Sequence, residues 1–501
     1  MASLKKDIFA NYIGRAWTAI LGFSLIPLYI KFLGVESYGL VGFFASLTAV
    51  IGILDLGIST TMTRELAKRS SNSDSNDTQR DLVRTLELIY WGISVFSGII
   101  IFVGAPFIAN YWIKSEIDVN TLMNAVRFMA LSIAFRFPMS LYQGGLMGLQ
   151  KQVLVNKIVV SIGTLRGFGA VLILWLFSPT IEAFFIWQAI ISLAESFVFF
   201  ISIWKVLPKS LKKPSFKLNI IKEIWRYAAA ISANAIISIF LTQLDKIILS
   251  NMLTLKMFAY YTIAATAASS IWLIIVPFSK AVFPRLVSFY ETKQKEKLIS
   301  LFHNTSKLLS LLLFPFCAVL IVFSKQILSI WLQDQIIVEN AYIIMSLLVF
   351  GTMLNGMASL PSMCAPAFGW PLLLTYTNII QSIFIIPLII ILVNWLEGIG
   401  AAIAWIILNC TYIFVLPHLF FRHYLAEEKK KWYLFDLFIP LTVAFSVSII
   451  SSFVAPKMSM QLFNIVWILG TGLIGFFATA ISIPSMRNTI YEKVIFKFKK
   501  K

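Results

Sequence analysis

Long apolar runs separated by short polar breaks follow one another along the whole chain. Most of these runs reach or exceed the roughly 20 residues that an α-helix needs to cross the hydrocarbon core of a bilayer. The pattern predicts about fourteen transmembrane helices. Their expected extents are 8–32, 40–63, 86–112, 119–149, 152–177, 180–207, 222–251, 257–286, 300–332, 338–365, 371–395, 398–424, 432–455 and 461–484.

The composition agrees with a chain that lies largely in a membrane. Hydrophobic residues make up 59% of the 501 positions, charged residues make up 13%, and the mean hydropathy is +0.84. A soluble core cannot absorb this much apolar surface. The predicted fold class is therefore an all-α polytopic membrane protein.

The net charge of +19 is distributed unevenly between the two predicted membrane faces. Most of the 42 Lys and Arg residues fall in connections on one face. Because basic loops stay in the cytoplasm, this bias places both termini inside and fits an even number of spans. We expect these loops to contact anionic membrane lipids rather than nucleic acid.

The sequence offers little for catalysis. Cys317, Cys364 and Cys410 lack a paired spacing, and no phosphate-loop pattern occurs, so we expect no metal site and no cofactor. The longest polar connections are predicted on the cytoplasmic face, and the outer turns are too short for the acidic catalytic loop of a membrane glycosyltransferase. These features favour transport through the helices over an enzyme.

A polar stripe runs along the second predicted span, where Thr48, Gly52, Asp55, Ser59 and Thr63 share one helix face. Tight helix packing also selects Gly, Ser and Thr, so the small residues fit packing as well as a wet passage. A charge favours a wet cavity or an ionic partner, because Asp or Arg at the bilayer centre costs about 2.5–3.5 kcal/mol. Similar stripes in other spans contain Arg15, Arg136, and Asn234 with Asp245.

Arginines dominate the charges inside the first six predicted spans. Arg15, Arg136 and Arg166 stand against Asp55 and Glu195, which leaves one positive charge in excess. Arg presents a planar fork that suits phosphate oxygens, so an anionic, phosphate-bearing substrate fits this interior. Ion pairs of Arg15 with Asp55 and of Arg166 with Glu195 are the structural alternative. Because those pairs would leave Arg136 without an acidic partner, Arg136 is the first candidate for a ligand contact.

The seventh predicted span adds an acidic and a basic residue side by side. Asp245 and Lys246 diverge by about 100° around a helix, so we do not expect them to neutralise each other. Coupling to protons or sodium through Asp55, Glu195 or Asp245 is a further hypothesis, which no spacing in the sequence demands.

A basic segment divides the chain into six predicted spans before it and eight after it. This division predicts two six-helix lobes around a central cavity, a common transporter arrangement, with two extra helices at the C-terminal end. The expected parts are an N-terminal lobe at 1–207, a cytoplasmic linker at 208–221, a C-terminal lobe at 222–424, and two helices with a basic tail at 425–501.

The segments "LGVESYGLVGFF" and "LDLGISTTMTREL", within residues 11–66, carry a family resemblance. This region resembles Wzx-like polysaccharide flippases of the multidrug/oligosaccharidyl-lipid/polysaccharide (MOP) exporter superfamily. The resemblance implies a flippase that moves a polyprenyl-diphosphate-linked oligosaccharide, for O-antigen or a related envelope glycan, to the outer leaflet of a bacterial inner membrane. Polysaccharide polymerase machinery is an expected partner. Many relatives have twelve spans, so helices 13 and 14 have no role assigned by the resemblance.

The resemblance also implies a substrate site in the cavity. By location, Arg15, Arg136 and Arg166 match the cationic residues that meet diphosphate and sugar in that family, and Asp55 lies within the similar "LDLGIST" stretch. Asn234 and Asp245 complete the candidate site from the polar stripes. The alternatives are a peptidoglycan-precursor flippase and a cation-coupled multidrug exporter, although an arginine-rich cavity repels cationic drugs.

Overall fold

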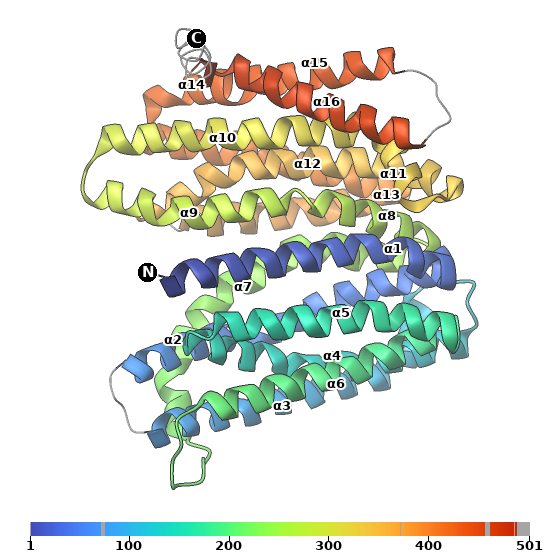
Figure 1. Cartoon of the computed structure of the whole chain (residues 1–501), viewed down its shortest axis with the longest axis vertical. Helices are drawn as coiled ribbons and strands as arrows, with labels where there is room; N and C mark the ends of the chain where they lie inside the picture. The colour runs from blue at the N-terminus through green and yellow to red at the C-terminus, as the bar shows by residue number, and fades with distance from the viewer. Residues whose placement is uncertain (1, 72–75, 371, 456–460, 485, 488–501) are drawn as a thin grey trace, which may run out of the picture. The chain divides into compact units, whose positions relative to one another are not determined.

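The computed structural model describes the chain except residues 1, 72–75, 371, 456–460, 485 and 488–501. The side chains of 2–13, 15, 71 and 225–241 also lie outside the described part. Regular secondary structure in the described residues is helical, which confirms the predicted fold class (Figure 1). By their contacts the residues form two compact units, Met1–Ala259 and Tyr260–Lys501.

The first unit holds the helices up to the start of α8. They are α1 Ala2–Ile51, the 3-10 turn η1 Gly52–Asp55, α2 Ile58–Ser71, α3 Asn76–Phe107, the π-helical turn η2 Ile108–Trp112, α4 Val119–Gly148, α5 Gln152–Leu176, α6 Ile181–Val206, α7 Leu218–Met252 and α8 Leu255–Ser269.

The second unit begins within α8. It continues with α9 Trp272–Glu291, α10 Lys295–Val322, α11 Ser324–Leu332, α12 Gln335–Ala367, α13 Leu372–Tyr424, the 3-10 turn η3 Ala426–Glu428, α14 Lys429–Lys431, the π-helical segment η4 Trp432–Phe438, α15 Ile439–Val454 and α16 Gln461–Ser482.

Ten helical segments among the described residues are long and apolar enough to cross a membrane. Two of them contain a residue with non-helical backbone angles, Gly34 in α1 (φ 79°) and Glu397 in α13 (φ 49°). Both residues fall in the polar breaks that the sequence places between consecutive spans. Counting the halves of these helices separately, and adding the long helices α4 and α7, gives fourteen segments, as many as the sequence predicts. The predicted span 257–286 is divided between α8 and α9, however, and 300–332 between α10 and α11.

Capping side chains fix several helix starts close to their predicted positions. The Asp118 carboxylate accepts hydrogen bonds from the backbone N–H groups of Asn120 and Thr121, both at 3.1 Å, and α4 begins at the expected residue. Asp334 does the same at the start of α12. Such caps satisfy backbone donors that the first helical turn leaves without partners.

The second predicted span, 40–63, is not one continuous helix. The α-helix stops at Ile51, η1 follows, and Leu56 (φ 46°) and Gly57 (φ 65°) adopt left-handed conformations before α2 begins. An apolar run reports burial in the membrane but not such a local break. The polar stripe predicted over 48–63 is therefore divided between two helical pieces.

Glycines allow α2 to lie against α4 in the first unit. A Cβ atom on Gly144 would lie 2.6 Å from the Ser59 carbonyl oxygen, and one on Gly148 would lie 2.5 Å from the Thr63 carbonyl oxygen. The Thr63 hydroxyl donates a hydrogen bond to the Gly144 carbonyl at 2.8 Å. Ser59 and Thr63 thus face a neighbouring helix, which favours the packing explanation for this end of the stripe.

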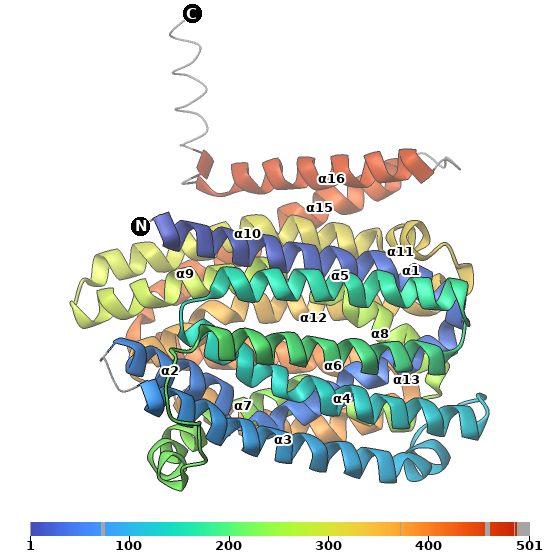
Figure 2. The ribbon, with the colours of Figure 1, turned by 60° about the horizontal axis from the view of Figure 1, so that its bottom comes forward.

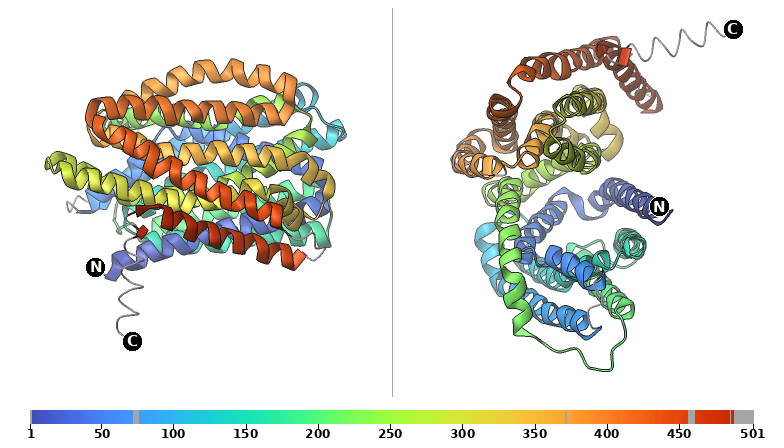
Figure 3. Two further views of the ribbon diagram at one scale, coloured as in Figure 1. Left: turned by 90° about the horizontal axis from the view of Figure 1, so that it is seen from above. Right: turned by 90° about the vertical axis from the view of Figure 1, so that its left-hand side faces the viewer.

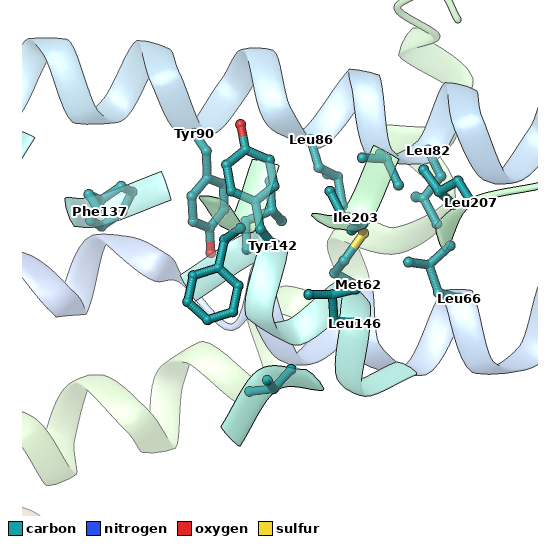
Figure 4. Close-up of a cluster of buried hydrophobic side chains, with 14 of the residues drawn as sticks. Met62, Leu66, Leu82, Leu86, Tyr90, Phe137, Tyr142, Leu146, Ile203 and Leu207 are labelled. Carbon is teal, nitrogen blue, oxygen red and sulfur yellow. The ribbon is translucent and has the colours of Figure 1, made fainter. Parts of the chain in front are cut away.

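The core of the first unit forms where α2, α3, α4 and α6 meet. Figure 4 shows Met62 and Leu66 of α2 packed with Leu86 of α3, Leu146 of α4 and Ile203 of α6. Helix α4 contacts both α3 and α6, and α5 packs against α1 (Figure 2). This packing positions the inward faces of α4, α5 and α6 for the candidate site.

In the second unit, α12 packs against α13 and α10 (Figure 3). Helices α15 and α16 pack against each other, and both contact α10. The predicted lobe boundaries, with the linker at 208–221, stay a prediction.

Candidate functional site

Two arginines share one glutamate in the first unit. The Glu195 Oε2 atom of α6 lies 2.6 Å from Nη2 of Arg166 on α5 and 3.9 Å from Nε of Arg136 on α4. We call Arg136, Arg166 and Glu195 the cationic cluster. Its three side chains carry a net charge of +1 when all are ionised. Glu195 is 7% exposed, whereas Arg166 is 16% and Arg136 is 38% exposed.

Neighbouring polar groups hold Arg166 in place. Its Nη1 group donates to Gln188 Oε1 at 2.9 Å and to Ser192 Oγ at 3.2 Å. Gln188, Ser192 and Glu195 are spaced 4 and 3 residues apart, so they line one face of α6. In turn, the Trp187 indole N–H donates to the Arg166 carbonyl at 3.1 Å. Arg166 is therefore fixed by buried partners.

Arg136 is held much more loosely. Its 3.9 Å approach to Glu195 is longer than a hydrogen bond, and Arg136 forms no hydrogen bond with the described residues. The prediction that Arg136 lacks an acidic partner is wrong, because α4 brings it to the same carboxylate that pairs with Arg166. The predicted Arg166–Glu195 pair is present. The Arg136 guanidinium therefore keeps N–H donors that none of the described residues accepts.

Asp55 is satisfied by nearby hydroxyl groups. The Ser59 hydroxyl donates to Asp55 Oδ2 at 2.9 Å, and the Tyr90 hydroxyl of α3 donates to Oδ1. The side chain of Arg15 lies outside the described residues, so the expected pair of Arg15 with Asp55 stays a prediction. The structure places Asp55 in a different group of contacts from the cationic cluster.

In α7 the structure corrects one expectation. The Lys246 ammonium lies 3.5 Å from Asp245 Oδ1, so these neighbours do form an ion pair. The prediction considered only the directions of the two Cα–Cβ bonds, which diverge around the helix. The long Lys246 side chain folds back and brings its ammonium to Asp245. The side chain of Asn234 lies outside the described residues, and its proposed role stays a prediction.

A buried carboxylate that the sequence reasoning missed lies in α3. Glu87 Oε1 accepts a hydrogen bond from the Tyr142 hydroxyl at 2.8 Å, and Oε2 accepts one from Arg84 at 2.7 Å. The Trp91 indole N–H donates to the Tyr142 oxygen at 3.1 Å. The ring of Tyr142 also lies beside the apolar core (Figure 4). Glu87 is the second residue of the predicted span 86–112. An acidic residue inside a predicted span was the sequence feature that could have identified this site.

Among the described residues, no group of three or more His, Cys, Asp or Glu side chains is placed to hold a metal ion. The three cysteines are free thiols in separate positions. The cationic cluster, in which two arginines face one buried glutamate, is the clearest chemical feature of the first unit.

Comparisons with known proteins identify the family of the chain. The model of a family described as polysaccharide biosynthesis protein matches residues 4–290. A protein of Shigella flexneri described as "Putative O-antigen transporter" is 22% identical over 410 residues, which cover 81% of this chain and 94% of that protein.

Solved structures share the fold. A structure of the lipid II flippase MurJ in an inward closed conformation has a TM-score of 0.68 and 15% sequence identity, and the match covers 98% of this chain and 99% of that chain. An inward-facing multidrug resistance MATE family transporter of the MOP superfamily has a TM-score of 0.65 and 16% identity over 82% of this chain and 96% of that chain. The predicted polytopic helical fold is confirmed.

Proposed function

Because the chain belongs to the polysaccharide biosynthesis protein family, we propose that it is a flippase for a polyprenyl-diphosphate-linked oligosaccharide. The glycan is an O-antigen unit or a related envelope polysaccharide unit, and it moves from the cytoplasmic to the outer leaflet of a bacterial inner membrane. The Shigella relative and the family description support this substrate class. Polysaccharide polymerase machinery is the proposed partner that receives the flipped glycan, and both termini lie in the cytoplasm.

The cationic cluster is the observation that carries the proposal. A diphosphate offers several anionic oxygens, and a guanidinium can bind two of them in parallel. Arg136 is exposed and has unused donors, whereas Arg166 is committed to Glu195, Gln188 and Ser192. Arg136 therefore binds the diphosphate, and Arg166 holds Glu195 in position beside it.

Glu195 also limits how tightly the substrate binds. Its carboxylate lies close enough to Arg136 to attract it when the diphosphate leaves. Because one acid faces two arginines, the site keeps a positive charge that attracts the substrate without trapping it. Alternating access then requires that the polar head enter from the inner leaflet and leave outside, while the prenyl chain stays in the lipid. Ion coupling through Asp55, Glu195 or Asp245 remains a hypothesis.

A peptidoglycan-precursor flippase is the second candidate function. The match with the MurJ structure spans nearly the whole chain, including the helices beyond the first twelve segments. Both substrate classes carry a polyprenyl diphosphate, so the role of Arg136 is the same in each. A multidrug exporter of cationic compounds is disfavoured by the positive charge of the cluster.

Native mass spectrometry of protein purified gently from its own host tests the proposal. The wild type is compared with Arg136→Ala and with Arg127→Ala, a control on the same helix whose guanidinium lies over the Phe102 ring at 5.5 Å. We expect a diphosphate-linked oligosaccharide on the wild type and on Arg127→Ala. Loss of contacts to a charged group, about 1.5–3 kcal/mol, depletes it by about 10-fold to 150-fold in Arg136→Ala.

Each other outcome has a defined meaning. Equal retention of the glycolipid by Arg136→Ala would leave the flippase and refute the arginine site. A bound peptidoglycan precursor would select the second candidate, and a bound cationic compound would select the exporter.

A further inference from the structure

A polar seam joins α10 to the start of the thirteenth segment in the second unit. His303, Ser306 and Ser310 are spaced 3 and 4 residues apart on one face of α10. They meet three residues of the facing segment, Glu428, Trp432 and Asp436, which are spaced 4 residues apart. We call these six residues the C-terminal seam. Helix α10 contacts η4, the segment that directly follows α14 along the chain (Figure 1).

His303 stands between two carboxylates. Its Nδ1 atom lies 2.5 Å from Asp436 Oδ2, and its Nε2 atom lies 3.0 Å from Glu428 Oε2. A neutral imidazole has one N–H donor and one acceptor nitrogen, whereas an ionised carboxylate only accepts. Only the doubly protonated ring can donate to both partners at once. A neutral ring would set a nitrogen lone pair against a carboxylate oxygen.

From this geometry we propose that His303, Glu428 and Asp436 form a proton-binding site that fastens α15 and α16, the predicted thirteenth and fourteenth spans, to α10. The proton is the ligand, and the imidazolium is the charged link between the two elements. The site lies within the second unit and is separate from the cationic cluster, so it stands independently of the proposed substrate.

The surroundings keep this proton in place. Asp436 is 1% exposed, and its Oδ1 atom has no hydrogen-bond partner among the described residues. The imidazolium is therefore the main compensation for a buried negative charge. The Phe302 ring lies edge-on to His303 with ring centroids 5.6 Å apart, and the rings of Phe421 and Trp432 pack against Phe302.

Other charged groups around the seam act from its edges. Lys431 Nζ lies 3.1 Å from Glu428 Oε1, on the opposite carboxylate oxygen from His303. Lys307 acts electrostatically on Asp436 from one turn further along α10. With His303 protonated, three positive groups face the two carboxylates. Loss of the proton removes the positive group that lies between Glu428 and Asp436, which favours opening of the seam.

Two hydrogen bonds in the seam do not depend on the proton. The Trp432 indole N–H donates to Ser306 Oγ at 2.8 Å, and the Ser310 hydroxyl donates to the Asp436 carbonyl. These contacts align the two elements by themselves. A variant at Ser306 therefore removes a seam contact without removing the proton site, which makes it a matched control.

The two other histidines provide internal references. His418 and His423 are both exposed, and His418 Nδ1 accepts from Lys429 Nζ at 2.6 Å, so neither is enclosed by carboxylates in the described residues. Side-chain nitrogen NMR of the full chain, labelled with ¹⁵N-histidine, distinguishes imidazolium from neutral rings between pH 6 and 9. We expect an imidazolium signal at pH 7 that disappears in His303→Gln.

Variants then separate a proton site from a purely structural contact. Asp436→Asn keeps the side-chain shape and removes one carboxylate, so we expect the midpoint of His303 titration to fall by about 1–3 pH units. Ser306→Ala should leave that midpoint unchanged. A His303 ring that is neutral at pH 7 in the wild type, or a midpoint that does not change in Asp436→Asn, overturns the proposal.

Hydrogen exchange tests the fastening role. After correction for intrinsic exchange rates, residues 426–438 should lose protection in the wild type once the pH passes the His303 midpoint. In His303→Gln they should be less protected than in the wild type below that midpoint, with no added pH dependence. Equal protection in both proteins at every pH would refute the link between the proton and the fastening of α15 and α16.

Discussion

Truncation of the two arginines of the cationic cluster should affect different properties of the protein, its stability for Arg166 and its transport function for Arg136. Arg166→Ala removes a buried group with three polar partners, namely Gln188, Ser192 and Glu195. Arg136→Ala removes a half-exposed group whose nearest acidic atom is 3.9 Å away. We expect Arg166→Ala to lower the free energy of unfolding strongly and Arg136→Ala to change it little, and under the proposed function we expect Arg136→Ala to impair glycan transport.

The sizes follow from burial and geometry. Breaking a buried ion pair by removing one partner destabilises a protein by about 3–5 kcal/mol, because a buried charge and its hydrogen-bonding groups lose compensation. An exposed pair without a hydrogen bond contributes about 0–1 kcal/mol. The expected difference between the two variants is therefore about 3 kcal/mol. Glu195 keeps Arg136 nearby in the Arg166 variant, which places the loss toward the lower end of its range.

Denaturation with SDS in mixed micelles measures the stability of both variants, and display of surface glycan in a host lacking the native gene measures their function. A double-mutant cycle with Glu195→Gln isolates the interaction between Arg166 and Glu195. We expect coupling above about 1 kcal/mol for that pair and about 0–1 kcal/mol for Arg136 with Glu195. Equal stability losses in the two arginine variants, or normal display by Arg136→Ala, would refute this division of roles.

Two further changes test the packing of the first unit. Gly148→Ala places a Cβ about 2.5 Å from the Thr63 carbonyl and should destabilise the protein by about 1–3 kcal/mol in the same titration, whereas Gly104→Ala, which meets nothing within 4 Å, should not; no loss in the first variant contradicts the close approach. Tyr142→Phe removes the hydroxyl that donates to Glu87 and should lose about 1–3 kcal/mol, and an unchanged stability would show that water replaces this hydroxyl.

Hydrophobic runs were sufficient to locate the membrane-crossing helices, because burial in a bilayer selects apolar residues over a whole span. The breaks at Gly34 and Glu397 were also predictable, since polar residues interrupt the runs there. The break before α2 was not predictable. Left-handed backbone at Leu56 lies inside an apolar run, where hydropathy carries no record of local geometry.

Only part of the candidate site was predictable, because the sequence shows which charges lie in the spans but not how the helices face one another. The Arg166–Glu195 pair could be named from composition, because few charges lie in the first six spans. Sharing of Glu195 with Arg136 depends on how α4 is rotated against α6, and a helical wheel describes only one helix at a time. The pairing of Asp245 with Lys246 depends on side-chain torsions, which the wheel also omits.

The left-handed joint at Leu56 and Gly57 makes the second segment two rigid rods instead of one. The carbonyl contacts with Gly144 and Gly148 attach the α2 rod to α4, while the preceding rod continues from α1. Bending in this segment is therefore expected to concentrate at the joint, with α2 travelling as part of the α4 body. The Ser59 hydroxyl of α2 and the Tyr90 hydroxyl of α3 donate to Asp55 just before the joint, so these hydrogen bonds link the preceding rod to both helices.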